Sequence, residues 1–149
     1  MLTRKLASAL LVTAMALLGL PAAGAEETPK TFPGGGLVSI EQAKSMLDKG
    51  AQFVDSRVAA EYAEKHIKSA LSVPFKEEFP KVSKTGAGDH MDAAKLPSDK
   101  NKVLIFYCNG SPCWKGYKAA MQAIKAGYKK VYWFRDGMPA WEAKGLPAD

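Results

Sequence analysis

Cys108 and Cys113 are the side chains in this sequence most suited to covalent chemistry, and the chain has no other cysteines. Cys108 ends the apolar run 102–108, and Cys113 follows five positions later, just before the helix-favouring stretch 115–126. At such a strand-to-helix turn, loop N–H groups and the positive end of the helix dipole stabilise a thiolate. The sequence therefore predicts nucleophilic sulfur chemistry, with Cys108 as the catalytic residue.

The position of the two cysteines restricts their other roles. A disulfide framework stabilises a small fold by joining distant segments, and two cysteines in one loop do not do this. A local disulfide between them is an alternative that the sequence leaves undecided. Zinc sites need further ligands, and His66 and His90 have no paired ligand spacing, so we expect neither a metal nor a cofactor.

The first 25 residues have the pattern of an export signal. Arg4 and Lys5 precede an apolar run over 6–20, and small residues then lead to Ala25. This pattern predicts a signal peptide over 1–25, cleaved before Glu26. Because the apolar run is short for a membrane span, we expect a periplasmic protein without stable membrane insertion. An uncleaved anchor is the alternative.

Size and charge restrict the function further. The chain after residue 25 is long enough for one domain and too short for two ordinary ones. The full sequence has a net charge of +6, about +4 without Arg4 and Lys5, and its lysines are scattered along the chain without aromatic residues interleaved among them. This distribution favours small anionic substrates and argues against a nucleic-acid partner.

Helical patterns alternate with short apolar runs along the chain. A linker rich in Pro and Gly is expected over 26–36, and a domain over 37–149. The predicted elements are a helix 39–50, a strand 52–55, a helix 59–64, a strand 70–73, a surface excursion 76–100 with one helical turn, a strand 102–107, a helix 115–126, a strand 130–134 and a helix 138–144. This alternation predicts an α/β fold whose parallel sheet is covered on both faces.

Several motifs, in this order, resemble those of the rhodanese-like domain family. They are Phe53-Val-Asp-Ser-Arg57, Glu61-Tyr62, His66-Ile-Lys-Ser-Ala70 with Val73-Pro74, and then, after Cys108, Gly127-Tyr-Lys-Lys-Val131 and Asp136-Gly-Met-Pro-Ala-Trp141 with Gly145-Leu-Pro147. The resemblance covers residues 37 to 147. It implies a small doubly wound α/β domain with helices on both faces of a parallel sheet.

The resemblance also implies an activity. Active members of the family are sulfurtransferases that carry sulfur as a persulfide, here on Cys108, from a small anionic donor such as thiosulfate to a thiol or cyanide acceptor. The substrate would be bound by the loop residues Asn109, Gly110, Ser111, Cys113, Trp114 and Lys115. Lys118, one helical turn after Lys115, would add positive potential at the loop mouth.

Two further residues have supporting roles in this interpretation. The family pattern gives Asp55 the task of orienting the loop and the neighbouring backbone. Arg57 is expected to pair with a carboxylate, and Glu61 is one candidate. Pro112 departs from the family pattern and has no N–H, so the loop has one donor fewer for the anion.

Other functions remain open. Cys113 either resolves the persulfide or is a packing residue. The chain is alternatively a dithiol redox protein using Cys108 and Cys113, although their spacing is wider than in thioredoxin motifs. A third alternative is an inactive binding module, which the intact Cys108 disfavours. A phosphatase loop needs an Arg where this chain has Trp114.

Overall fold

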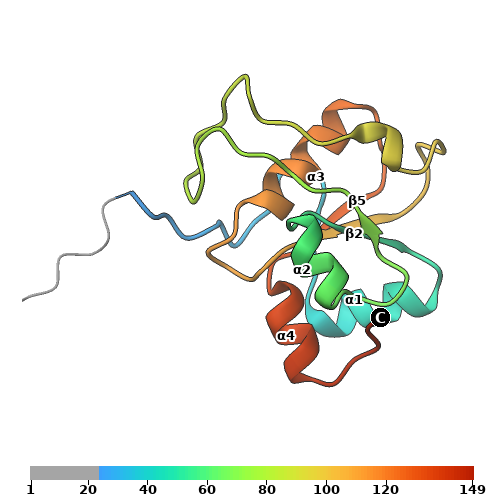
Figure 1. The fold of residues 1–149 in the computed structure, drawn as a ribbon. Coiled ribbons are helices and arrows are strands. Elements are labelled where there is room, and N and C mark those ends of the chain that lie inside the picture. Colours follow the sequence, from blue (N-terminus) through green and yellow to red (C-terminus); the bar gives the residue numbers. More distant parts are fainter. Residues whose placement is uncertain (1–23) are drawn as a thin grey trace, which may run out of the picture.

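A five-stranded, all-parallel sheet forms the centre of the protein in the computed structural model, which describes residues 24–149 (Figure 1). The strands lie side by side in the order β1 (Gly36–Leu37), β5 (Val131–Phe134), β4 (Leu104–Tyr107), β2 (Gln52–Asp55) and β3 (Leu71–Ser72). The central strand β4 pairs with both β2 and β5, and all of its residues are buried. The predicted α/β fold is confirmed, whereas the predicted signal peptide lies outside the described residues except for Gly24 and Ala25.

Helices cover both faces of the sheet, as Figure 1 shows. Helix α3 (Lys115–Lys125) packs on one face together with the excursion, which contains the single helical turn η1 (Ala93–Lys95). Helices α1 (Ile40–Asp48) and α4 (Gly137–Ala143) pack on the other, with α2 (Ala59–Glu64) at their side. The sheet is therefore the middle layer of three, in agreement with the doubly wound arrangement.

Local sequence explains where the first and third helices lie. The Ser39 hydroxyl accepts a hydrogen bond from the Gln42 N–H, and the Gln42 side chain accepts one from the Ser39 N–H, so both residues cap the start of α1. Helix α3 presents Ala119, Ala120 and Ala123 to the sheet, and all three are buried. Their small side chains let α3 lie close to β4 and β5.

The segment 26–36, predicted to be a linker, packs on the domain instead. Phe32 is a core residue that contacts the rings of Tyr117 and Trp133, and Thr28 is buried. Gly36 and the next residue form β1, which pairs with β5. The folded unit therefore begins near Glu26 and not at residue 37. The sequence did not indicate this, because the partners of the segment are distant in sequence and no local pattern reveals them.

The remaining elements agree with the prediction apart from their ends. The strands predicted over 70–73, 102–107 and 130–134 are shorter, at Leu71–Ser72, Leu104–Tyr107 and Val131–Phe134. Between residues 24 and 149, none of the helices combines the length and apolarity needed to span a bilayer.

Candidate active site

Cys108 lies at the carboxyl end of the central strand β4, the edge at which open α/β sheets bind ligands. Its side chain is buried, and the Gly116 N–H in the first turn of α3 donates a hydrogen bond to Cys108 Sγ at 3.3 Å. A Cβ at position 116 would lie 3.1 Å from the carbonyl carbon of Tyr107. Glycine therefore allows α3 to approach the end of the strand, so that the start of the helix points at the sulfur.

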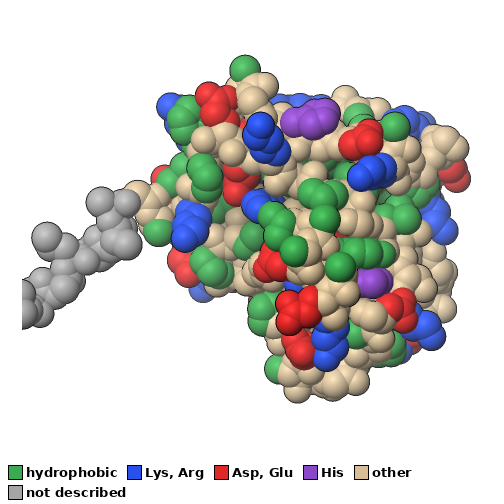
Figure 2. Space-filling model, viewed as in Figure 1, with side chains coloured by type: hydrophobic (Ala, Val, Ile, Leu, Met, Phe, Trp, Pro, Cys, Tyr) green, Lys and Arg blue, Asp and Glu red, His purple; other side chains and the backbone are tan. Residues whose placement is uncertain are grey.

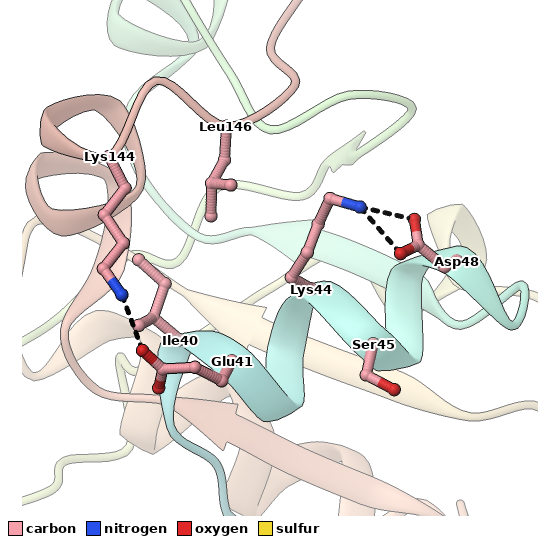
Figure 3. A pocket seen from close by; sticks show the side chains of 7 residues that line it. All are labelled: Ile40, Glu41, Lys44, Ser45, Asp48, Lys144 and Leu146. Atoms are coloured by element: carbon pink, nitrogen blue, oxygen red, sulfur yellow. Dashed lines mark hydrogen bonds and ion pairs between the residues drawn. The ribbon is translucent and has the colours of Figure 1, made fainter.

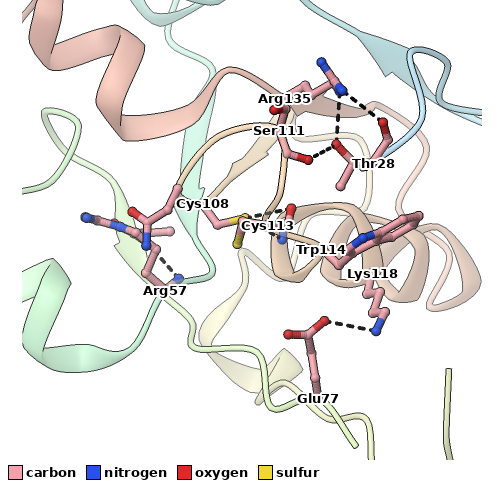
Figure 4. The surroundings of a disulfide bond; sticks show 12 residues. Thr28, Arg57, Glu77, Cys108, Ser111, Cys113, Trp114, Lys118 and Arg135 are labelled. Atoms are coloured by element: carbon pink, nitrogen blue, oxygen red, sulfur yellow. Dashed lines mark hydrogen bonds and ion pairs between the residues drawn. A yellow bond between two sulfur atoms is a disulfide. The ribbon is translucent and has the colours of Figure 1, made fainter. Parts of the chain in front are cut away.

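Cys108 and Cys113 form a disulfide within the loop (Figure 4). Their Cα atoms are 6.2 Å apart, inside the range that a disulfide requires. Gly110 has a φ of +93°, and its carbonyl oxygen accepts a hydrogen bond from the Cys113 N–H at 3.0 Å. The turn through Pro112 thus permits the approach, and the structure shows the loop in its oxidised state.

A cavity of about 530 Å³ opens beside Cys113. Four of the predicted substrate-binding residues line it: Asn109, Cys113, Trp114 and Lys115. The other two, Gly110 and Ser111, do not line it, nor does Cys108, which is only 2% exposed. In the oxidised loop, therefore, Cys113 is the cysteine that faces the cavity.

Asn109 and Ser111 have protein partners of their own. The Asn109 amide donates to a carboxylate oxygen of Glu61 at 2.6 Å. The Ser111 carbonyl oxygen accepts from the Thr28 N–H at 3.1 Å and from the Thr28 hydroxyl. These two residues accordingly tie the loop to α2 and to the N-terminal segment.

Asp55 and Arg57 form a buried ion pair under the loop. Asp55 accepts hydrogen bonds from the Arg57 N–H, from its guanidinium at 2.7 Å and from the Tyr107 hydroxyl at 2.7 Å. Arg57 pairs with a carboxylate as expected, but the partner is Asp55 and not the candidate Glu61, which binds Asn109 of the loop. The hydrogen bonds of the Asp55 side chain go to Arg57 and Tyr107, so they fix the end of β2 and the neighbouring residue of β4.

This cluster also shifts two pKa values. Burial opposes the charge of Arg57, but the hydrogen bonds and negative charge of Asp55 outweigh it and raise the pKa of Arg57. Burial, and next the charge of Asp55, raise the pKa of Tyr107 far above the ordinary value of a phenol. Tyr107 is therefore a neutral hydrogen-bond donor to Asp55.

Lys118 is not at the loop mouth, contrary to the sequence-based expectation. It is buried on α3, where its ammonium pairs with Glu77 at 3.0 Å and donates to the Phe79 carbonyl oxygen at 2.9 Å. Glu77, which the sequence analysis did not single out, lines the cavity beside Cys113 (Figure 4). The ion pair therefore holds the excursion against α3 and forms one wall of the cavity.

The N-terminal segment forms a further support that the sequence did not predict. The Trp114 indole N–H donates to the Glu26 carbonyl oxygen at 2.8 Å. Arg135, which follows β5, donates to the hydroxyl and carbonyl oxygens of Thr28, both at 3.0 Å. Buried Trp114 consequently anchors the segment as well as lining the cavity. The only local signal was Phe32, an apolar residue in an otherwise linker-like stretch.

Another hollow lies between α1 and the end of the chain, and its charged side chains pair with one another (Figure 3). Lys144 pairs with Glu41 at 2.6 Å, and Lys44 pairs with Asp48 at 2.7 Å. Within residues 24–149, no three His, Cys, Asp or Glu side chains are grouped to hold a metal ion. The Cys108 loop is thus the place where this part of the chain presents reactive groups to a cavity.

Comparisons with known proteins identify relatives of this chain. The chain is 30% identical over 130 residues to "Protein HIGH ARSENIC CONTENT 1, mitochondrial" of Arabidopsis thaliana, covering 83% of this chain and 72% of the relative. It is 26% identical over 112 residues to "Thiosulfate sulfurtransferase 18" of the same plant, covering 74% of this chain and 80% of the relative.

A solved structure supports the fold. The crystal structure of the BH2092 protein from Bacillus halodurans superposes with a TM-score of 0.56 at 22% identity, covering 77% of this chain and 75% of that one. The family model described as "Rhodanese-like domain" matches residues 39–144, which include strands β2 to β5 and the Cys108 loop. The chain belongs to the rhodanese-like domain family.

Proposed function

We propose that the protein is a sulfurtransferase that carries sulfur as a persulfide on Cys108. The observation that supports this most is the position of Cys108 Sγ, at the end of β4 and within hydrogen-bonding distance of the Gly116 N–H at the start of α3. A thiolate or persulfide anion at this point is stabilised by the N–H group and the helix dipole without a general base. The sulfurtransferase name of one relative points the same way.

The proposed reaction has two displacement steps after the disulfide is reduced. The Cys108 thiolate attacks the outer sulfur of thiosulfate, forms an S–S bond and releases sulfite. A cyanide ion or thiolate then attacks the outer sulfur of the persulfide, forms thiocyanate or a new persulfide, and releases the Cys108 thiolate. Lys115 and Lys81 line the cavity and supply positive charge for an anionic donor.

A dithiol redox function is the second candidate, and the Cys108–Cys113 disulfide favours it. Cys113 faces the cavity, so an incoming thiolate attacks its sulfur, forms a mixed disulfide and expels Cys108 as the thiolate. In a separate step, the Cys113 thiolate attacks the inner sulfur of a Cys108 persulfide, closes the disulfide and releases hydrosulfide. Cys113 is then the resolving residue that switches sulfur transfer off.

Intact-mass measurement of the reduced protein after thiosulfate treatment tests both candidates. The wild type and Cys113→Ser are expected to gain one sulfur atom, and folded Cys108→Ser is expected to gain none and to lose thiosulfate:cyanide turnover. Cys113→Ser should hold the persulfide longer than the wild type and should resist oxidative inactivation. Loading or turnover in folded Cys108→Ser refutes the assignment of the nucleophile, and equal persulfide lifetimes refute the resolving role of Cys113.

Export to the periplasm belongs to the same proposal. Its support is the sequence pattern of residues 1–25 together with the disulfide, since disulfides persist in oxidising compartments. N-terminal sequencing of the protein from a bacterial periplasmic extract is expected to begin at Glu26. Membrane-bound material that begins at Met1 refutes cleavage. Small anionic donors and thiol acceptors are the proposed partners, with no role for nucleic acid.

A further inference from the structure

A hollow of about 530 Å³, distinct from the one beside α1, adjoins the cavity beside Cys113. The two share Glu77, Pro80 and Lys115 as lining residues, so they form one continuous depression, here called the sheet-edge groove. It extends from the Cys108 loop past the residues that follow β2 and β3, along the carboxyl ends of three neighbouring strands. This groove is longer than a donor as small as thiosulfate requires.

Basic side chains outnumber acidic ones in the lining of the groove. Lys76, Lys95 and Lys115 line it, and no carboxylate of the described residues lies within 4.0 Å of their ammonium groups. Of the acidic residues in the groove, Glu77 pairs with Lys118, Asp92 accepts the Ala94 N–H at 3.1 Å, and Glu61 accepts from the Asn109 amide at 2.6 Å. The groove therefore has charge available for an anionic ligand.

These lysines are held on ordered backbone. Lys76 and His90 exchange two backbone hydrogen bonds, at 2.8 and 3.0 Å, across the excursion. Lys95 ends the capped turn η1, and Lys115 begins α3. Because the three come from three elements, their positive charges are spread along the groove and are not confined to one point.

Apolar side chains lie between these charges. Val58 lines the groove and is 46% exposed, an unusual degree for a large aliphatic side chain in this domain. Pro74 and Pro80 lie in the same lining. On the face that carries α2, Figure 2 shows basic, acidic and apolar side chains interleaved. A ligand that fits this surface has an apolar or peptide-like body with several carboxylates.

We propose that the sheet-edge groove binds the sulfur acceptor, and that this acceptor is an acidic peptide thiol. The peptide's thiol reaches the loop at Cys113, and its carboxylates lie along Lys76 and Lys95. This inference rests on the proposed sulfurtransferase function and adds the chemical class of its acceptor. Sulfur passes from the Cys108 persulfide to the peptide thiolate, which becomes a peptide persulfide as Cys108 returns to the thiolate.

Three capped tripeptides, Glu-Cys-Glu, Gln-Cys-Gln and Lys-Cys-Lys, serve as acceptors for the thiosulfate-loaded protein. The acidic peptide is expected to have about a three- to tenfold higher kcat/KM than the neutral one, falling as salt is added, and the basic peptide the lowest value. In the double variant Lys76→Gln/Lys95→Gln, the preference for the acidic peptide should disappear while thiosulfate:cyanide turnover is kept.

Lys49→Gln/Lys129→Gln is the matched control. It removes the same charge from exposed lysines that precede β2 and β5, at the amino ends of the strands and away from the groove. This variant should retain the preference for the acidic peptide. Equal kcat/KM values for the three peptides, or an equal loss of preference in the control variant, overturn the proposal.

Binding separates this inference from the proposed function. Calorimetric titration with the tripeptide Glu-Ser-Glu needs no sulfur chemistry, and the wild type should bind it more tightly than Lys76→Gln/Lys95→Gln does. If Glu-Ser-Glu binds but thiosulfate does not load the protein with sulfur, the groove assignment is supported and the sulfurtransferase function is refuted. If sulfur loads but the wild type and the variant bind Glu-Ser-Glu equally, the function is supported and the groove assignment is refuted. A nine-residue peptide with Glu-Cys-Glu at its centre tells the two sources apart: undiminished kcat/KM indicates a protein segment, and a large decrease indicates a free small peptide.

Discussion

The buried ion pair between Lys118 and Glu77 leads to the most quantitative prediction. Their side chains are 2% and 4% exposed, and Lys118 also donates to the Phe79 carbonyl oxygen. Lys118→Met keeps an unbranched side chain of similar length but leaves a buried carboxylate without its cation. Such a loss is expected to lower the free energy of unfolding by about 3–5 kcal/mol. Urea denaturation at pH 7, followed by tryptophan fluorescence, measures it.

Lys65→Met is the matched control. Lys65 pairs with Glu142 at 2.8 Å, slightly closer than the buried pair, but the two side chains are 47% and 53% exposed. Because water solvates and screens this pair, its loss should lower the free energy of unfolding by at most about 1 kcal/mol. Equal losses in the two variants would show that burial does not set the strength of the effect.

A double variant identifies the cause of the loss. Lys118→Met/Glu77→Leu removes both charges of this pair, so much of the stability lost in Lys118→Met should return. A double variant as unstable as Lys118→Met refutes the unpaired carboxylate as the cause. It would point instead to the hydrogen bond that the Phe79 carbonyl oxygen loses in both variants.

Two further predictions concern the residues around Cys108. A Cβ on Gly137, which has a φ of +63°, would overlap the Cys108 carbonyl oxygen and lie 2.7 Å from the Gly110 nitrogen. Gly137→Ala should therefore lower the free energy of unfolding by about 3 kcal/mol in the same urea assay. The control is Gly127→Ala, at a φ of +94° in open space, which should lower it by about 1 kcal/mol. The raised pKa of Tyr107 favours the folded state below the unfolded-state pKa near 10.0, and this stabilisation is lost as the pH rises above it. Tyr107→Phe should therefore lose stability less steeply than the wild type above pH 10 in pH-dependent urea denaturation, and parallel slopes contradict the assignment.

Local sequence predicted the elements whose determinants are neighbours in the chain. The capping pair at Ser39 marked the start of α1, and the apolar run ending at Cys108 marked the strand and its reactive loop. It also placed Asp55 at the end of β2, where it accepts from the Tyr107 hydroxyl on the adjacent strand. In each case the interaction follows from one motif or from pairing between parallel strands.

The cavity walls depend on contacts that the sequence does not encode locally. The hydrogen bond from Trp114 to Glu26 joins residues 88 positions apart, and the one from the Thr28 hydroxyl to Ser111 joins residues 83 apart. Lys118 illustrates the same limit, because its position one turn after Lys115 indicated an exposed face. Its burial depends on Glu77, which reaches α3 from the excursion.

This division between loop and walls has a functional consequence. The groups that stabilise the Cys108 sulfur, the end of β4 and the Gly116 N–H, are encoded within a few residues of it. The groups that decide what reaches the sulfur come from the excursion, α2 and the N-terminal segment. Substitutions in these walls are therefore expected to change acceptor preference while sulfur loading is kept, whereas substitutions in the loop should change loading itself. Under the proposed sulfurtransferase function, the identity of the acceptor can therefore vary within one fold without any change in the chemistry at Cys108.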